Sequence, residues 1–225
     1  MTKPPSEHTM FLATGNPDKR AELQALLHPL AIPLVCIADL PDQEQREVVE
    51  DAPSLMGNAI KKARYWAQKQ SMDAIADDTG LFVDLLDGDP GVYSARYAGP
   101  DATYKDNVEK LLAETQRALL EKNLPADTPV AAHFSTVMVW AQHQPDQHLG
   151  DRLRIHAVEG RCDGVIISSP RGAHGFGYDP VFVPHRPGEP AQSFAELTPE
   201  QKNKVSHRAK AVEMLVSVIS SNHTL

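Results

Sequence analysis

Short apolar runs and helical spacing alternate along the first part of the chain. Thr9–Thr14 (TMFLAT) is an apolar run of strand length, and Gly15 and Asn16 follow it at once. Pro17 then stands where the first residue of a helix is favoured, with Asn16 as its N-cap. Beyond it, leucines recur at i, i+3, i+4 and i+7, so one face of this helix is expected to be buried. These leucines are Leu23, Leu26, Leu27 and Leu30.

The pattern in the rest of the chain predicts an α/β protein. Further helices are expected at about Ser54–Gln70 and Thr103–Leu120, with a last one that buries Val212, Leu215, Val216 and Ile219. Strands are expected at Ile32–Ile37, Ala74–Ala76, Ala131–Ala141, Arg154–Glu159 and Val165–Ser168, with a loop at Pro145–Asp146. Residues 39–51 carry six acidic side chains against one basic side chain, Arg46, and predict an exposed loop with some strand. We expect a single domain over residues 9–225 after a flexible tail at residues 1–8.

Composition narrows the class of protein. The chain has 225 residues, of which 41% are hydrophobic and 23% charged, as is ordinary for a globular protein. Its 22 Lys and Arg against 30 Asp and Glu give a net charge of −8, which argues against a protein that coats nucleic acid. Since no apolar stretch reaches the length of a membrane helix or a secretory signal, we expect a cytoplasmic protein without a membrane segment. Cys36 and Cys162 are expected to be buried thiols.

Two segments carry residues that suit phosphate and metal binding. At Thr14-Gly15-Asn16-Pro17-Asp18-Lys19, the free N–H groups and positive end of a helix favour an anion, with Lys19 within one turn. The alternative is an ordinary strand-to-helix turn. Asp77-Asp78-Thr79-Gly80 follows an apolar strand, and adjacent carboxylates at a strand end are a usual way to hold Mg²⁺. The alternative is a turn or helix-capping aspartate.

Two further segments suit a nucleobase and its phosphates. Gly175-Phe176-Gly177-Tyr178-Asp179-Pro180 places an aromatic ring between glycines, where it can stack on a planar base, although a packed Phe in a turn is an equal alternative. Gln201–Lys210 is the strongest basic cluster of this acidic chain, although it could also be a solvated helix face. Groups that can donate hydrogen bonds to phosphates, carboxylates that can hold a metal and an aromatic ring that can stack on a base together indicate a nucleotide enzyme.

These segments, in this order, resemble the Ham1/inosine triphosphatase family of noncanonical purine nucleoside triphosphate pyrophosphatases. The resemblance spans nearly the whole chain after the tail. It is carried by TGNPDK (Thr14–Lys19), GNAIKKA (Gly57–Ala63), ADDTG (Ala76–Gly80), PGVYSARYAG (Pro90–Gly99), GFGYDPVF (Gly175–Phe182) and KNKVSHRAKA (Lys202–Ala211).

The resemblance implies a fold, an activity and partners. The implied fold is an elongated two-lobed α/β structure with a central curved mixed sheet flanked by helices and a cleft between the lobes. The implied activity is hydrolysis of ITP, dITP and XTP to the monophosphate and pyrophosphate, with Mg²⁺ as cofactor and Mn²⁺ as an alternative metal. Family members are typically homodimers, and Pro90–Gly99 resembles the loop region on the dimer side. Neither nucleic acid nor a membrane is an expected partner.

The resemblance also implies roles for single residues. By position, Asp78 matches the metal-binding catalytic acid with Asp77 beside it, and either could orient or deprotonate the attacking water. Residues 14–19 match the triphosphate loop, helped by Lys62, and Thr79 matches a substrate contact. The segments that recognise the base and close over the substrate are matched by Phe176, Gly177, Tyr178, Asp179, Lys202, His207 and Arg208.

One position departs from the family pattern. Many members have Glu-Asn-Ala where this chain has Gly57-Asn58-Ala59, so a carboxylate is missing there, and Glu50 is expected to be the second metal ligand. Donors near His207 and Arg208 are expected to face a 6-keto group and to be left unpaired by the 6-amino group of adenine. Two alternatives stay open: a pyrophosphatase of the same fold for other modified nucleotides, and a nucleotide-sensing module that does not hydrolyse its ligand.

Overall fold

The computed structural model describes residues 9–46, 48–144 and 152–223, and the contacts divide them into two compact units. Unit 1 takes its described residues from Met1–Asp78, Val137–Glu159 and Ala211–Leu225, and unit 2 takes them from Thr79–Thr136 and Gly160–Lys210. The tail at 1–8 and the expected loop at Pro145–Asp146 lie outside the described residues. The single domain over residues 9–225 stays a prediction.

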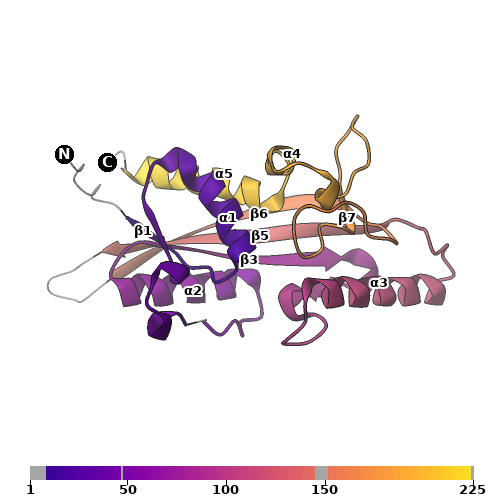
Figure 1. Cartoon of the computed structure of the whole chain (residues 1–225), viewed down its shortest axis with the longest axis horizontal. Coiled ribbons are helices and arrows are strands. Elements are labelled where there is room, and N and C mark those ends of the chain that lie inside the picture. The colour runs from indigo at the N-terminus through magenta and orange to yellow at the C-terminus, as the bar shows by residue number, and fades with distance from the viewer. Residues whose placement is uncertain (1–8, 47, 145–151, 224–225) are drawn as a thin grey trace. The chain divides into compact units, whose positions relative to one another are not determined.

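Unit 1 is built on parallel strands. Strand β1 (Met10–Leu12) pairs with β2 (Leu34–Cys36) on one side and β3 (Ala74–Val83) on the other, both in parallel. Three helices pack on these strands: α1 (Pro17–Leu27), α2 (Leu55–Gln70) and most of α5 (His207–His223) (Figure 1). The expected leucine face of α1 is confirmed, since Leu23 and Leu27 are buried in a core that also holds Trp140 and Leu215.

Alternation along the strands sends neighbouring residues to different helices. Met10 and Leu12 of β1 lie in the core with α1 and α5, whereas the ring of Phe11 stacks on Trp66 of α2 at 4.7 Å between centroids. Helices α1 and α5 therefore cover one face of these strands and α2 covers the other. The same alternation orients the two aspartates of β3.

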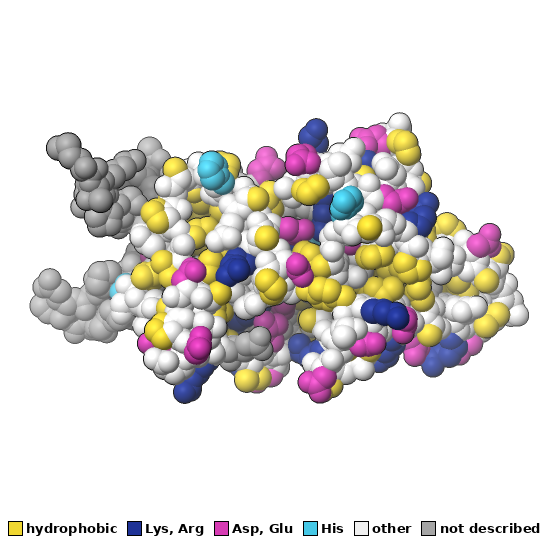
Figure 2. All heavy atoms as spheres, in the orientation of Figure 1, with side chains coloured by type: hydrophobic (Ala, Val, Ile, Leu, Met, Phe, Trp, Pro, Cys, Tyr) yellow, Lys and Arg dark blue, Asp and Glu magenta, His cyan; other side chains and the backbone are white. Residues whose placement is uncertain are grey.

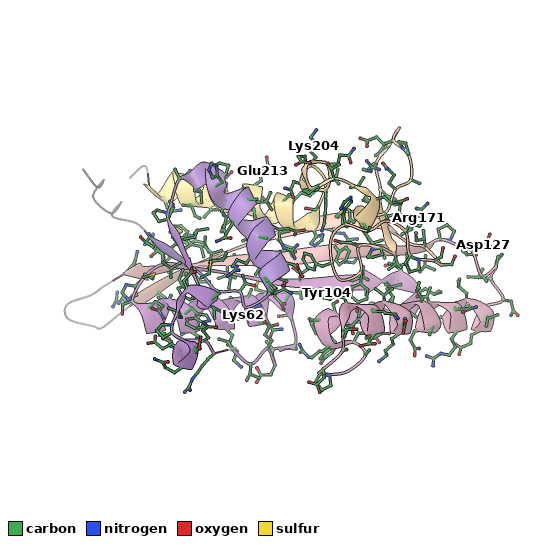
Figure 3. All side chains as sticks on the ribbon, in the orientation of Figure 1. Lys62, Tyr104, Asp127, Arg171, Lys204 and Glu213 are labelled. Atoms are coloured by element: carbon green, nitrogen blue, oxygen red, sulfur yellow. The ribbon has the colours of Figure 1, made fainter. Side chains whose placement is uncertain are left out.

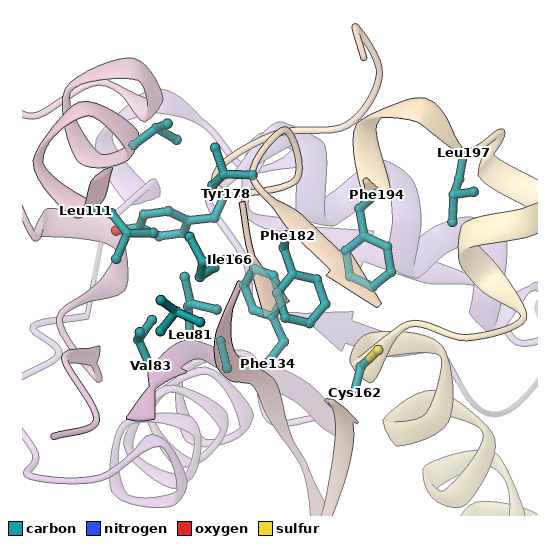
Figure 4. Close-up of a cluster of buried hydrophobic side chains, with 14 of the residues drawn as sticks. Leu81, Val83, Leu111, Phe134, Cys162, Ile166, Tyr178, Phe182, Phe194 and Leu197 are labelled. Carbon is teal, nitrogen blue, oxygen red and sulfur yellow. The ribbon is translucent and has the colours of Figure 1, made fainter. Parts of the chain in front are cut away.

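Unit 2 contains antiparallel strand pairs and a separate core. Strand β4 (Pro90–Gly91) pairs antiparallel with β3, and β7 (Phe182–Pro184) pairs antiparallel with β6 (Arg152–Ile166). Strand β5 (Val130–Gln144) and helices α3 (Tyr104–Glu121) and α4 (Pro199–Asn203) complete the unit. Its core packs aromatic rings of Phe134, Phe182 and Phe194 against aliphatic side chains such as Leu81 and Leu111 (Figure 4).

The strands follow the order β2-β1-β3-β5-β6-β7, with β4 on β3, so the sheet is mixed. This confirms the expected α/β class with a mixed sheet flanked by helices. Strands β3, β5 and β6 each contribute residues to both units. None of the helices in the described ranges is long and apolar enough to cross a membrane.

Three expectations about elements were wrong. Strand β3 has ten residues, so Asp77–Gly80 lie inside the strand and do not follow the end of a short strand at Ala74–Ala76. Arg154–Glu159 and Val165–Ser168 are not two strands, because a single strand, β6, runs from Arg152 to Ile166. The described part of residues 39–51 contains 3₁₀ turns at Ile37–Asp39 and Asp42–Glu44 and no strand. In both strands, polar residues inside the strand resembled its end: Asp77 and Asp78 of β3 have their partners on α1 and α2, whereas Glu159, Arg161 and Asp163 of β6 alternate with buried residues and stay exposed.

Candidate active site

The Thr14–Lys19 segment begins α1, as expected, but two of its backbone donors are already in use. Asn16 caps the helix: its Oδ1 accepts from the N–H of Asp18 at 2.9 Å and of Lys19 at 3.1 Å. Pro17 has no N–H to offer. The expectation that these helix amides are free for an anion is therefore wrong. The Lys19 ammonium and the hydroxyl of Thr14 are two side-chain donors of this segment that suit a phosphate.

Unit 1 gathers carboxylates and lysines near the start of α1. The Nζ of Lys19 lies 3.0 Å from Oδ2 of Asp77, and the Nζ of Lys62 lies 2.6 Å from Oε1 of Glu50. Asp77 and Asp78 are adjacent in β3, so their side chains point to opposite faces, Asp77 toward α1 and Asp78 toward α2. Lys62, which is labelled on α2 in Figure 3, has a side chain that is 12% exposed and is attracted to all three acids.

Burial and charge act against each other in this cluster. Burial raises the pKa of Asp78 above its ordinary value, with Lys62 and Lys19 acting in the opposite direction. Burial alone would lower the pKa of Lys62, but attraction to Asp77, Glu50 and Asp78 outweighs it and the pKa is raised. Two buried carboxylates, Asp77 and Asp78, and the partly exposed Glu50 thus lie close to two ammonium groups.

Asn58 belongs to this cluster, although the sequence analysis gave it no role. It is fully buried, its Nδ2 donates to Oδ2 of Asp78 at 3.0 Å, and its Oδ1 accepts from the N–H of Ala52 at 2.9 Å. The available signal was its place on the apolar arc of α2, one turn after Leu55, where an amide side chain needs buried partners.

The departure at Gly57 has a structural explanation. Gly57 is the third residue of α2, and its N–H donates to Oγ of the N-cap Ser54. In a capping box this position holds Glu or Gln, so a Glu here would sit at a helix-capping position. A Cβ on Gly57 would lie 2.7 Å from the Cβ of Ala52, which leaves no room for a side chain.

Among the described residues, no three His, Cys, Asp or Glu side chains are grouped as a ready-made metal cage. The oxygen donors of Glu50, Asp77 and Asp78 are nevertheless of the hard type that Mg²⁺ prefers. Mg²⁺ usually takes only one or two carboxylates and completes its shell with water and phosphate oxygens. The donor set therefore fits Mg²⁺ bound together with a phosphorylated ligand.

Unit 2 holds the aromatic and basic candidates. Oδ2 of Asp179 accepts from the backbone N–H of Phe176 at 3.0 Å and from Nζ of Lys202 at 2.6 Å. The Lys202 ammonium also lies 5.1 Å from the centre of the Phe176 ring. Gly175 makes this possible: its φ is +74°, and a Cβ there would lie 2.1 Å from Oδ2 of Asp179. Asp179 thus orients the Phe176 loop and pairs with the buried lysine.

Arg208 lies against the same ring. Its guanidinium carbon is 5.5 Å from the Phe176 centroid, and its Nη2 lies 3.4 Å from Oγ1 of Thr79. Tyr104, which the sequence analysis did not single out, brings its ring to 5.7 Å from that of Phe176. The half-buried Phe176 is therefore surrounded by two cations and a second aromatic ring.

Two other predicted residues lie in the core of unit 2. The ring of His207 stacks on Phe134 at 4.5 Å. Tyr178 is buried, its hydroxyl donates to the carbonyl of Ser94 at 2.8 Å, and burial raises its pKa above the ordinary value. The side chains of His207 and Tyr178 support the core in this conformation. The sequence pattern does not distinguish these buried residues from the more exposed Phe176.

The basic segment is not a solvated helix face. Lys202, His207 and Arg208 are 5%, 3% and 2% exposed, whereas Lys204 and Lys210 face solvent. The helix is interrupted between Asn203, where α4 ends, and His207, where α5 begins. Ser206 caps α5 by accepting a hydrogen bond from the N–H of Ala209. On the face in Figure 2, the basic side chains that reach the surface of the described chain are interspersed with acidic ones.

An α/β protein with buried carboxylate–lysine and arginine–aromatic clusters can be compared with known proteins. A profile of the Ham1 family matches residues 10–218. The chain is 41% identical over 210 residues to the dITP/XTP pyrophosphatase of Escherichia coli (strain K12), which covers 93% of this chain and 97% of that protein. It is 40% identical over 210 residues to the dITP/XTP pyrophosphatase of Thermoanaerobacter sp. (strain X514), over 93% of this chain and 96% of that one.

Solved structures agree with the sequence comparison. A HAM1 protein from Coxiella burnetii superposes with a TM-score of 0.76 at 34% identity, over 95% of this chain and 99% of that one. The Ham1 protein of Staphylococcus aureus has a TM-score of 0.75 at 30% identity, also over 95% and 99%. The chain belongs to the Ham1 family.

Proposed function

We propose that this chain hydrolyses the noncanonical purine nucleoside triphosphates ITP, dITP and XTP to a nucleoside monophosphate and pyrophosphate, with Mg²⁺ as cofactor. The observation that carries the proposal is the cluster of Glu50, Asp77 and Asp78 with Lys19 and Lys62 in unit 1. Buried carboxylates are unfavourable beside a triphosphate unless a cation accompanies it. The names of the relatives from Escherichia coli and Thermoanaerobacter support the same activity.

Asp78 and Glu50 are the residues proposed to hold Mg²⁺. When bound, Mg²⁺ neutralises charge that develops on the phosphate oxygens in the transition state. Mn²⁺ has similar ligand preferences and is the proposed substitute. Asn58 donates to Oδ2 of Asp78 at 3.0 Å and so fixes the orientation of the carboxylate that is proposed to hold the metal. Asp77 or Asp78 orients the attacking water and accepts its proton.

The lysines are proposed to exchange partners when the triphosphate binds. Lys19 and Lys62 now pair with Asp77 and Glu50, and phosphate oxygens compete for the same ammonium groups. Thr14 and the backbone at Gly15 lie at the start of the same loop. Asn16 and Pro17 shape this loop and Asp18 donates its N–H to the cap, so these three residues position the donors.

The residues proposed to bind the base lie in unit 2. The Phe176 ring provides a stacking surface, and Lys202 and Arg208 are donors for the 6-keto group of hypoxanthine or xanthine. Gly177, Tyr178, Asp179 and His207 hold this surface in place, and Thr79 contacts the substrate from β3. Adenine has a 6-amino group, which donates hydrogen bonds, where hypoxanthine has an accepting keto group. Lys202 and Arg208 would therefore lack an acceptor when ATP binds, so ATP is expected to bind less well than ITP.

A screen of nucleoside triphosphates tests the function. ITP, dITP, XTP, ATP, GTP and modified pyrimidine triphosphates are incubated with the chain in Mg²⁺ or in EDTA, and pyrophosphate and phosphate are measured separately. We expect Mg²⁺-dependent pyrophosphate release from the first three. Binding without hydrolysis would support the sensing module, and faster turnover of modified pyrimidines would support a different substrate class.

Two variants connect this activity to the site. Asp78→Asn is expected to fold but to release no pyrophosphate, whereas Asp101→Asn, which changes an exposed acid in a turn, is expected to match the original chain. Near-normal turnover by Asp78→Asn would contradict the assignment. A cytoplasmic homodimer is part of the proposal, and its assembly state is measured by light scattering of the same preparation.

A further inference from the structure

A pair of threonine hydroxyls, one of them fully buried, joins β3 to β5 beside the proposed base site. Oγ1 of Thr136 lies 2.8 Å from Oγ1 of Thr79. Thr136 is 0% exposed, whereas Thr79 is half-buried. Since a buried hydroxyl is unfavourable unless it is hydrogen-bonded, Thr136 pairs with Thr79 instead of facing the apolar core.

The same oxygen of Thr79 meets Arg208. A guanidinium can only donate, so Nη2 of Arg208, at 3.4 Å, uses Oγ1 of Thr79 as an acceptor. The guanidinium in turn lies 5.5 Å from the Phe176 centroid. Thr79 is β-branched and has few side-chain rotamers, so the turn of its Oγ1 toward Thr136 also decides where Arg208 finds its acceptor.

We propose that Thr136 is a positioning residue for base recognition, acting through Thr79 on Arg208. It holds the Thr79 hydroxyl in the rotamer that receives Arg208, and so holds the guanidinium beside Phe176. This inference rests on the proposed function, because it requires Thr79 and Arg208 to meet the substrate. It goes beyond that function by making discrimination between 6-keto and 6-amino purines depend on a residue with no exposed surface.

Thr136→Val replaces the hydroxyl with a methyl group of similar size, and Thr136→Ser keeps the hydroxyl and removes the methyl group. We expect Thr136→Val to lower kcat/KM for ITP by about 3- to 10-fold, mainly through KM, as for the loss of one hydrogen bond. ATP turnover should change less, so the ITP/ATP ratio falls, and Thr136→Ser should recover most of it. Thr115→Val is the matched control, since Thr115 is also buried in unit 2 and donates to the carbonyl of Leu111 at 2.7 Å. It should lose stability without a change in the ratio.

A double-mutant cycle separates positioning from a general loss of packing. If Thr136 acts through Thr79, Thr79→Val with Thr136→Val should bind ITP no more weakly than Thr79→Val alone. Calorimetric binding of ITP with Mg²⁺ to Asp77→Asn, a background chosen to slow turnover while keeping the proposed metal ligands, gives the comparison with and without Thr136→Val. An absence of pyrophosphate release by the original chain would refute the proposed function. An unchanged ITP affinity and ITP/ATP ratio in Thr136→Val, or additive losses in the cycle, would overturn the role of Thr136 alone.

Discussion

Lys202 is a buried lysine that depends on one carboxylate. Its side chain is 7% exposed and that of Asp179 is 5% exposed, with 2.6 Å between Nζ and Oδ2. Two buried charges attract strongly, but much of that energy offsets their loss of water. Removing one partner is therefore more harmful than the net strength of the pair suggests, because the other charge stays buried alone.

Lys202→Met is expected to reduce the free energy of unfolding by roughly 3–5 kcal/mol, since the Asp179 carboxylate would remain buried without its counter-charge. Lys204→Met is the control, because Lys204 is exposed two residues further on and its loss should change stability by less than about 0.5 kcal/mol. Both values come from urea denaturation followed by circular dichroism. Equal stability of the two variants would show that the pair does not compensate Asp179.

The two cysteines behave as the sequence analysis expected, since both are buried free thiols. Burial raises the pKa of Cys162 to about 11, and burial followed by the nearby Asp39 charge raises that of Cys36. At pH 8 only about one Cys162 in a thousand is therefore a thiolate. We expect iodoacetamide to label neither residue in the folded chain and both in urea, as read by mass spectrometry of peptides. Rapid labelling of Cys162 under native conditions would contradict its burial.

At the scale of elements, the Phe176 loop depends on a glycine in a conformation that other residues rarely adopt. Gly175 has φ of +74°, and an added Cβ would lie 2.1 Å from Oδ2 of Asp179. Gly188 has a similar φ of +80° with nothing within 4 Å of its Cβ position. A side chain at either glycine would strain the backbone to a similar extent, because both have a positive φ. Only at Gly175 would the side chain also collide with a neighbouring residue.

Gly175→Ala is expected to lose more stability than Gly188→Ala, whose cost should be about 1 kcal/mol from backbone strain alone. The added methyl must also displace the Asp179 carboxylate from Phe176 and Lys202. Gly175→Ala should therefore raise the KM for ITP as well, while Gly188→Ala leaves it unchanged. Denaturation curves and initial rates of both variants provide the comparison, and indistinguishable variants would remove this role of Gly175.

Helices could be predicted from spacing, but the extent of two strands could not. The leucines of α1 and the apolar arc of α2 repeat every three or four residues, so a local pattern suffices. Strand β3 continues through Asp77 and Asp78 because α1 and α2 supply Lys19 and Asn58 as partners, and those partners lie far away in sequence. The local sequence around Asp77 and Asp78 therefore could not predict that the strand continues through them.

The candidate site shows the same division. The types and order of the residues predicted Lys62 and Arg208 as site residues. In the structure, Lys62 has Glu50 and Arg208 has the Phe176 ring as a neighbour. Asn58 and Thr136 were missed because the partner of a single polar residue on an apolar strand or helix face cannot be predicted from the local sequence. Tyr104 was missed because the first residue of a helix that contacts Phe176 looks like any exposed aromatic.

At the scale of the whole molecule, one histidine makes stability depend on pH. His156 stacks on Trp140 at 4.8 Å between centroids, and Asp73 accepts from Nε1 of Trp140 at 2.8 Å. Burial, and then the charge of Arg154, lower the pKa of His156, while Asp73 acts in the opposite direction. A folded-state pKa below the unfolded value means that the neutral ring stabilises the fold above about pH 6.5.

This contribution should be lost as the pH falls through the folded-state pKa of His156, because the unfolded chain takes up the proton first. His156→Phe keeps an aromatic ring against Trp140 and cannot be protonated. The stability of the original chain relative to His156→Phe should therefore fall between pH 7.5 and pH 5, whereas His174→Phe, at an exposed histidine, should follow the original chain. Unfolding free energies at each pH test this, and a constant difference would refute it.

The net charge of −8 and the buried acids set how the whole molecule should respond to its ligands. The lysines near Glu50, Asp77 and Asp78 already offset part of their charge, so Mg²⁺ alone gains little by binding there. ITP alone would bring four further negative charges to the same acids. Together, each ligand supplies the charge that the other lacks, so their effects on stability should exceed the sum of the separate effects.

Thermal unfolding of the Asp77→Asn variant, chosen to slow turnover, measures this coupling with Mg²⁺, ITP, both or neither. Mg²⁺ alone and ITP in EDTA should each shift Tm little. Both together at about 100 times the Kd should add roughly 2.7 kcal/mol of stability. Adding Asp78→Asn should remove the synergy, because the proposed metal loses a ligand, and adding Asp101→Asn should not. Equal stabilisation by ITP with and without Mg²⁺ would mean that Lys19 and Lys62 alone compensate the triphosphate, and that the acids of unit 1 do not serve to hold a metal.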